Sequence, residues 1–153
     1  MSPLEFLGLT IGITAGSAMA QRIARRRWQR SIRQLASSWQ MNYAARDQWL
    51  LAPRVAAVFP VLGAANIRII DVIYSTDRQT HRYVFTAEYT LGVVNRKRRL
   101  LRAASFSEPR QAAESEAARL ILAPSDLSLR DQYAKFAPPA PSDEGVEAPR
   151  LSK

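Results

Sequence analysis

Three residues in one stretch of the chain carry groups that could take part in acid–base chemistry. Asp71, His81 and Glu88 lie within residues 66–94, a stretch rich in β-branched and aromatic residues that predicts strands. A histidine oriented by a carboxylate is a common general base, so this set raises the hypothesis of an enzyme. His81 is the only histidine of the chain.

The expected strand pairing argues against that hypothesis. If the hairpin turns at Arg78, paired residues have numbers that add up to twice 78, or 156, which places Glu88 opposite Arg68 as an ordinary cross-strand ion pair. His81 then lies beside the turn. Asp71 faces Phe85 on the more aromatic side, which we expect to be the core, and a buried carboxylate there needs hydrogen-bond partners such as an arginine or a backbone N–H. We therefore predict no catalytic residue.

This register assigns each strand residue to one of two faces of the predicted sheet, and a slip of one residue would exchange the two faces. The first face pairs Arg68–Glu88, Ile70–Thr86, Val72–Val84 and Tyr74–Arg82. The second, predicted to be the core, pairs Ile67–Tyr89, Ile69–Ala87, Asp71–Phe85, Ile73–Tyr83 and Ser75–His81. Aromatic residues at this spacing could also stack on RNA bases, but the period of two favours a core.

Other kinds of site have no sequence support. The chain contains no Cys, which excludes disulfides, thiolate metal sites and a Cys nucleophile. A zinc site built from one His and carboxylates would be atypical, and there is no glycine-rich phosphate loop or nucleotide fingerprint. We expect no metal and no cofactor.

The elements that would position these residues predict an α+β fold. Asn66–Thr76, Thr80–Val94 and Arg99–Phe106 read as three strands of an antiparallel meander, and Trp39–Tyr43 reads as a possible fourth. Packed helices are expected within residues 44–59, over residues 111–122 by propensity, and over residues 127–136 with a cap at Ser125–Asp126.

The N-terminal segment reads as a membrane helix. Residues 6–20 carry no charge, with Glu5 before them and arginines after them. This is the reverse of a secretory signal peptide, and arginines that stay on the cytoplasmic side would leave the N-terminus outside. The run is short for a span of about 20 residues, so residues 1–23 are predicted to be transmembrane or membrane-associated. A soluble helix packed on the domain, or a frayed end, remains the alternative.

Small residues recur along this segment at every fourth position. Gly8, Gly12, Gly16 and Ala20 would form one stripe on a helix. Such stripes let two membrane helices approach closely, so the sequence predicts a homo-oligomer paired through them.

A basic amphipathic helix is expected at residues 24–38. Six arginines fall within residues 21–33, and they contribute much of the formal net charge of +9. The predicted contacts with anionic lipid are Arg22, Arg25, Arg26, Arg27, Arg30 and Trp28. A nucleic-acid-binding arm and a solvated basic face are the alternatives. A second basic run at residues 96–102 is interpreted as a solvated turn.

The whole layout resembles a group of uncharacterised bacterial single-pass membrane proteins. The resemblance covers residues 4–108 and rests on the apolar segment, the arginine-rich helix, RQLASSWQMNY and IRIIDVIYSTDRQTHRYVFTAEYT. It implies a location in the bacterial inner membrane and a small antiparallel-sheet domain. It implies no active site, because the pattern is one of architecture.

Together these patterns predict four regions. Residues 1–23 form the membrane helix, 24–38 the basic helix, 39–136 the α+β domain, and 137–153 a Pro-rich, acidic, disordered tail. The predicted function is that of a membrane-anchored, non-enzymatic interaction module whose domain lies in the cytoplasm. The alternative is a soluble basic module that binds nucleic acid or an acidic protein.

Overall fold

The computed structural model describes residues 3–77, 79–92, 96–110 and 117–139, with side chains from residue 16 onward. Its elements, in order, are α1 (Pro3–Ser38), β1 (Asn42–Arg46), α2 (Leu51–Ala57), β2 (Ala65–Thr76), β3 (Thr80–Leu91), β4 (Arg98–Pro109), β5 (Arg119–Leu122) and α3 (Leu129–Ala134). The α+β prediction is confirmed. The tail from residue 140 and the segment 111–116 lie outside the described residues.

The centre of the fold is one antiparallel sheet in the order β1-β2-β3-β4-β5. It is the predicted meander with one strand more than expected. The extra strand is β5, where helical propensity had favoured a helix through residue 122. In Arg119–Leu122, alternating side chains are partly buried, and the segment pairs with β4 through Ser105↔Ile121 and Phe106↔Leu120. Cross-strand pairing at the sheet edge here overrides local propensity.

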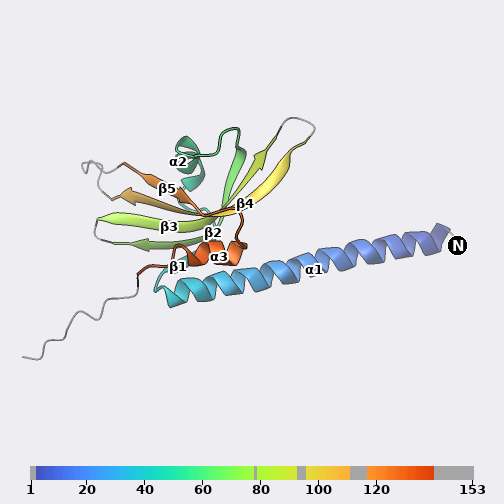
Figure 1. Cartoon of the computed structure of the whole chain (residues 1–153). Helices are drawn as coiled ribbons and strands as arrows, with labels where there is room; N and C mark the ends of the chain where they lie inside the picture. The colour runs from blue at the N-terminus through green and yellow to red at the C-terminus, as the bar shows by residue number, and fades with distance from the viewer. Residues whose placement is uncertain (1–2, 78, 93–95, 111–116, 140–153) are drawn as a thin grey trace, which may run out of the picture.

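Helices cover both faces of the sheet (Figure 1). Leu51 and Val55 of α2 pack on one face with residues such as Phe85 and Phe106. Ile32 and Ala36 of α1 pack on the other face, together with α3 residues and Val84 of β3. We call these the α2 face and the α1 face. The sequence predicted a single buried face, whereas both are buried because a helix layer covers each of them.

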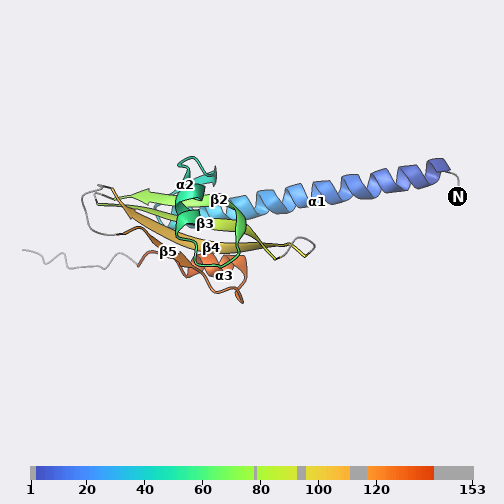
Figure 2. The same cartoon turned by 90° about the horizontal axis from the view of Figure 1, so that it is seen from above.

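The helix α1 is one uninterrupted helix of 36 residues. Its C-terminal part lies against the sheet, and its N-terminal half projects away from the domain in two perpendicular views (Figures 1 and 2). Residues 16–24 are all exposed, including Met19 at 65%. Within the described part of the chain, no helix combines the length and the apolar character needed to cross a membrane.

The two short helices begin where local polar groups can satisfy their free N–H groups. The Asp47 carboxylate accepts from the backbone N–H groups of Trp49 and Ala52, at 3.0 Å each, at the start of α2. Pro53 lies in the first turn of α2, where its missing N–H costs nothing. Helix α3 is capped by Ser128, whose Oγ accepts from Asp131 N–H, and not by the predicted Ser125–Asp126.

Two irregularities in β2 determine the pairing with β3. Residue numbers of paired positions add up to 155 at Ala65↔Thr90, to 156 at Arg68↔Glu88 and to 157 at Ile73↔Val84. Each step of one marks a β-bulge, and each bulge holds a residue with positive φ, Asn66 at 53° and Asp71 at 54°. Asn and Asp tolerate this left-handed conformation better than other side chains.

The predicted register is therefore correct in one half of the hairpin and wrong in the other. Arg68–Glu88, Ile69–Ala87 and Ile70–Thr86 pair as expected. Beyond the bulge at Asp71, the pairs shift to Ile73↔Val84 and Tyr74↔Tyr83. The extra residue moves Val72 onto the α2 face and leaves Asp71 and Ile73 on the α1 face, so Asp71 is not on the aromatic side where the sequence placed it.

Candidate functional site

Asp71 is the centre of the most unusual site in the described structure. Its side chain is fully buried and lies at the bulge of β2, below the C-terminal part of α1. A buried charge is costly unless it is paired and hydrogen-bonded. The partners of this carboxylate therefore decide what the site can do.

Four donated hydrogen bonds reach the Asp71 carboxylate. The Arg25 guanidinium donates two of them, from Nη1 to Oδ2 at 2.6 Å and from Nη2 to Oδ1 at 3.0 Å. The Trp28 indole donates from Nε1 to Oδ2 at 3.0 Å, and the Tyr43 hydroxyl donates to Oδ1 at 2.8 Å. We call Asp71, Arg25, Trp28 and Tyr43 the Asp71 cluster. It joins α1, β1 and β2 at one point.

The backbone at the same bulge is also held. Tyr133 of α3 is fully buried, and its hydroxyl donates to the Asp71 carbonyl oxygen at 2.8 Å. The same hydroxyl is 2.8 Å from Thr86 Oγ1 of β3. The carbonyl freed by the bulge thus has a partner, and α3 is fixed to the same residue as α1.

The electrostatics of the site keep its phenols neutral. Burial raises the pKa of Tyr43, and the hydrogen bond to the Asp71 carboxylate raises it further. Burial also raises the pKa of Tyr133, more strongly than its hydrogen bond with Thr86 lowers it. Neither tyrosine is therefore poised to give up its proton near neutral pH.

This arrangement suits a structural clamp better than an acid–base site. An ionised carboxylate offers about four acceptor positions. Each Asp71 oxygen already accepts two hydrogen bonds, so no lone pair remains to take a proton from a substrate. The bidentate Arg25 pair is the geometry that fixes a planar guanidinium most firmly.

The structure does not bring the predicted acid–base residues together. His81 pairs with Thr76, five residues along β2 from Asp71, which separates the two by about 17 Å at roughly 3.3 Å per residue. The His81 Nδ1 lies 3.2 Å from Thr76 Oγ1, beside the turn as expected. Glu88 lies 4.0 Å from Arg68, the predicted partner, and 2.5 Å from Arg99. No enzyme site is built from this set.

The described residues contain no cluster of three or more His, Asp or Glu side chains that could hold a metal ion.

A groove of about 370 Å³ runs beside the Asp71 cluster, between α1, the sheet and the start of α3. Its lining is mainly apolar and includes Ala24, Trp28, Ile70, Leu101 and Leu129. Among its polar lining residues, Arg25, Asp71 and Thr86 are held in the contacts already described.

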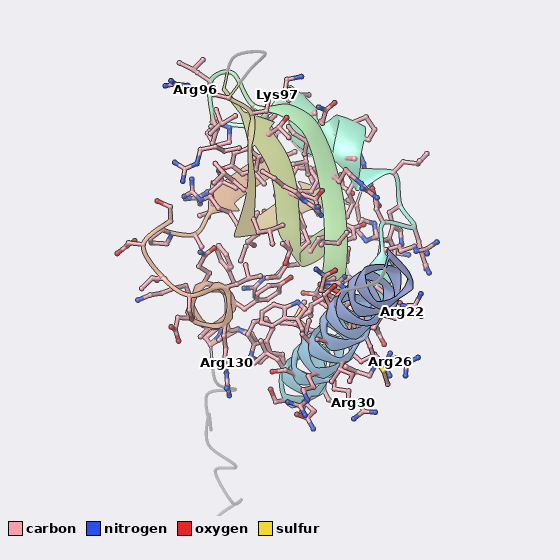
Figure 3. The ribbon with its side chains drawn as sticks, turned by 90° about the vertical axis from the view of Figure 1, so that its right-hand side faces the viewer. Arg22, Arg26, Arg30, Arg96, Lys97 and Arg130 are labelled. Atoms are coloured by element: carbon pink, nitrogen blue, oxygen red, sulfur yellow. The ribbon has the colours of Figure 1, made fainter. Side chains whose placement is uncertain are left out.

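The predicted lipid-contacting residues divide into two groups. Arg22, Arg26, Arg27 and Arg30 are exposed and make no ion pair with any described residue. Figure 3 shows three of them, Arg22, Arg26 and Arg30, pointing outward along α1. Arg25 and Trp28 instead have Asp71 as a partner, although the Arg25 side chain stays 40% exposed. Sequence reasoning identified both residues but not this role.

The predicted helix-pairing stripe lies partly within the described side chains. Gly16 and Ala20 are exposed, and a Cβ built on Gly16 would meet no atom within 4 Å. Side chains before residue 16 lie outside the description, so Gly8 and Gly12 are placed only as parts of α1.

Comparisons of the chain with protein-family models, with curated proteins and with solved structures found no match. The sequence and the geometry described above therefore carry the functional argument.

Proposed function

We propose that this protein is a membrane-attached, non-enzymatic interaction module. Its helix α1 holds it to the bilayer, and the sheet domain presents a surface to a partner. One observation carries the proposal: the uncharged residues 6–20 belong to the half of α1 that projects away from the domain (Figure 1). An apolar helix without protein cover is best satisfied by lipid.

Length and charge support the same proposal. Residues 3–21 precede the first arginine of α1 and span about 29 Å at roughly 1.5 Å per residue. The hydrocarbon core of a bilayer is about 30 Å thick. The exposed arginines Arg22, Arg26, Arg27 and Arg30 follow directly, where headgroup phosphates would lie, and each such contact is worth about 1 kcal/mol.

The Asp71 cluster would couple the orientation of the domain to that of the helix. Arg25 and Trp28 fix α1 to the sheet immediately after the projecting half ends. A rigid joint at this point makes the domain follow the helix, so the orientation of the helix in the bilayer would set the orientation of the domain. Arginines on the cytoplasmic side would place the N-terminus outside and the domain in the cytoplasm of a bacterial cell.

Membrane fractionation of the tagged full-length protein tests the proposal. Retention of the protein in the membrane pellet through a high-salt wash and an alkaline-carbonate wash is the expected result and indicates an inserted helix. Release by salt alone would indicate attachment through the arginines at the surface. A protein that stays in the supernatant before any wash would overturn the proposal and favour a soluble basic module.

A matched pair of variants sharpens this test. Replacing Arg22, Arg26, Arg27 and Arg30 by Gln should weaken retention at low salt, where their contacts with headgroup phosphates are not screened. Replacing four exposed arginines elsewhere, Arg46, Arg110, Arg119 and Arg130, removes the same charge and should leave retention unchanged. Equal loss in both variants would mean that net charge, and not the α1 arginines, governs the association.

Two parts of the proposal have their own measurements. The chain has no Cys, so a single introduced Cys can be labelled alone. A Lys135→Cys protein should resist a membrane-impermeant maleimide in intact cells, whereas labelling would contradict a cytoplasmic domain.

Pairing through the Gly8, Gly12, Gly16 and Ala20 stripe predicts that Ala20→Cys forms a disulfide-linked dimer in membranes. Adding Gly16→Ile should abolish this dimer.

A further inference from the structure

We infer that the end of the β3–β4 hairpin is a second contact with anionic lipid headgroups, made through Arg96, Lys97 and Arg98. This inference rests on the proposed membrane attachment and adds a second site to it. The three residues belong to the basic run 96–102, which the sequence alone suggested to be a solvated turn.

The structure divides this basic run into two parts. Arg99 pairs with Glu88 at 2.5 Å, and Arg102 donates from Nε to the Ala123 carbonyl oxygen at 3.0 Å, so these two side chains hold the fold together. Arg96, Lys97 and Arg98 are exposed and make no ion pair with any described residue. Three positive charges at one end of a hairpin therefore serve no contact within the described fold.

Gly92 and Arg96 approach each other closely at this end of the hairpin. The ladder closes at Leu91↔Arg98, and Gly92 follows with a φ of 114°. A Cβ at Gly92 would lie 2.4 Å from the Arg96 carbonyl oxygen, which no side chain can tolerate. Glycine thus lets the chain pass close to Arg96, beside the last pair of the ladder.

The hairpin end lies on the same side of the domain as the projecting half of α1. Figures 1 and 2 show it level with the middle of α1. The middle of a helix from Pro3 to Ser38 falls near Ala20, where the uncharged run ends and the arginines begin at Arg22. A surface perpendicular to α1 at this level would meet Arg22, the first of the α1 arginines, and the end of the hairpin.

The view along the projecting helix shows how far apart these groups are (Figure 3). Arg96 and Lys97 lie at one margin of the molecule, and Arg22, Arg26 and Arg30 lie at another. Two separated basic sites at one level, with an uncharged helix continuing beyond that level, match a flat anionic surface that has an apolar interior. A nucleic acid would match the charges but would leave the uncharged segment uncovered.

Contact at two points would restrain the tilt of the domain, which a single helix cannot do alone. The helix fixes the position of the domain, and the hairpin end then limits its rotation about an axis in the membrane plane. Partners of the sheet domain would meet a surface held at a defined angle to the bilayer.

The test uses the full-length protein with one introduced Cys and a water-sensitive fluorescent label. Lys97→Cys reports on the hairpin end. Arg119→Cys is the matched control, because it loses the same charge and pairs with Ser107, nine strand residues and about 30 Å from Arg98 along β4. Both proteins are bound to phosphatidylcholine vesicles with or without phosphatidylglycerol, and quenching by aqueous iodide is measured.

The expected result is shielding of the label at position 97, and not at 119, only in vesicles with phosphatidylglycerol. Adding Arg96→Gln and Arg98→Gln should lower the equilibrium constant for contact between the hairpin end and the membrane by about 30-fold. This change is equivalent to about 1 kcal/mol for each arginine. Adding Arg110→Gln and Arg130→Gln instead removes the same charge and should preserve the shielding.

Other outcomes separate the two proposals. A vesicle-bound protein whose label at 97 is quenched as readily as that at 119 would overturn the hairpin contact and leave membrane attachment standing. Equal shielding of the label at position 97 in vesicles with and without phosphatidylglycerol would overturn the role of anionic headgroups. A protein that does not sediment with vesicles would end both proposals. If it then bound DNA at low salt and lost that binding in Arg96→Gln/Arg98→Gln, the basic end would be a nucleic-acid contact.

Discussion

The two faces of the sheet are buried in different ways. The α2 face is closed by apolar and aromatic contacts, such as those of Leu51, Val55 and Phe85. The α1 face also has an apolar cluster, but it holds the buried polar side chains of the described residues. These are Asp71, Thr86, Glu88 and Gln132, and each has a hydrogen-bond or ion-pair partner.

This difference shows what each kind of burial can achieve. Apolar contact stabilises in proportion to area and has little directionality. Hydrogen bonds from Arg25 and Trp28 to one carboxylate require one position and one rotation of α1. The α2 face therefore supplies stability, whereas the α1 face also determines where the long helix lies.

The largest effect should come from removing the carboxylate at the centre of the α1 face. Asp71→Ala leaves the Trp28 and Tyr43 donors without partners and places alanine at a φ of 54°, so we expect a loss of about 3–5 kcal/mol in the free energy of unfolding. Denaturant unfolding measures this value. A loss below about 1 kcal/mol would contradict the clamp.

Asp71→Asn is the matched control for backbone strain, because asparagine tolerates the left-handed conformation. It should cost less than alanine and should shift the Trp28 indole N–H resonance without moving that of Trp49. Trp49 packs on Tyr74, with ring centroids 4.3 Å apart, and so reports on the α2 face.

A somewhat smaller effect is expected from the α2 face. Leu51→Ala removes a fully buried side chain and should cost about 2–4 kcal/mol through lost apolar burial and a cavity. In the folded protein, the Trp49 resonance should move and the Trp28 resonance should not. If both indole signals moved equally, the two faces would not be independent layers.

Alkaline pH should act mainly on the α1 face and should have the smallest effect of the three. Tyr43 and Tyr133 have a raised pKa in the folded state, so their contribution to stability is complete below the ordinary tyrosine pKa of about 10. Above that pH the unfolded chain loses these protons first, and stability falls with rising pH. Melting temperatures measured from pH 8 upward should show this decline.

Phenylalanine variants show which face of the sheet causes the fall in melting temperature at alkaline pH. Tyr43→Phe should flatten the fall in melting temperature above about pH 10, because the titrating group is gone. Tyr83 on the α2 face also has a raised pKa, caused first by burial and then by the nearby Glu108 charge. A Tyr83→Phe variant that flattened the curve more than Tyr43→Phe would reverse the comparison.

Some of the fold could be predicted because its signals are local. The alternation in residues 66–76 and 80–94 identified the central hairpin, and Arg68 did pair with Glu88. The bulge at Asp71 could not be predicted in the same way, because a one-residue insertion leaves the alternating pattern nearly intact. The bulge shows in the structure as a positive φ at Asp71 and as a shift in the pairing with β3, and neither is visible in a sequence.

The sequence predicted that a buried Asp71 would need polar partners, but not which residues supply them. A buried Asp71 was expected to need an arginine or a backbone N–H. Arg25 supplies that charge from 46 residues away, together with Trp28 and Tyr43. Two residues that the sequence assigned to lipid contact are thus shared with the sheet, since nothing local distinguishes an arginine that meets lipid from one that meets a carboxylate.

The sequence by itself determined the class of fold, the central strands, the uncharged run of residues 6–20 and the basic residues that follow it, because composition and periodicity are properties of neighbouring residues. Only the tertiary structure decided that both sheet faces are covered, that RLIL at Arg119–Leu122 is a strand, and that Asp71 anchors α1. It also decided that the end of the β3–β4 hairpin lies level with the middle of α1 (Figures 1 and 2). These features depend on which distant segments meet, and the chain sets that through packing and hydrogen bonding across the whole domain.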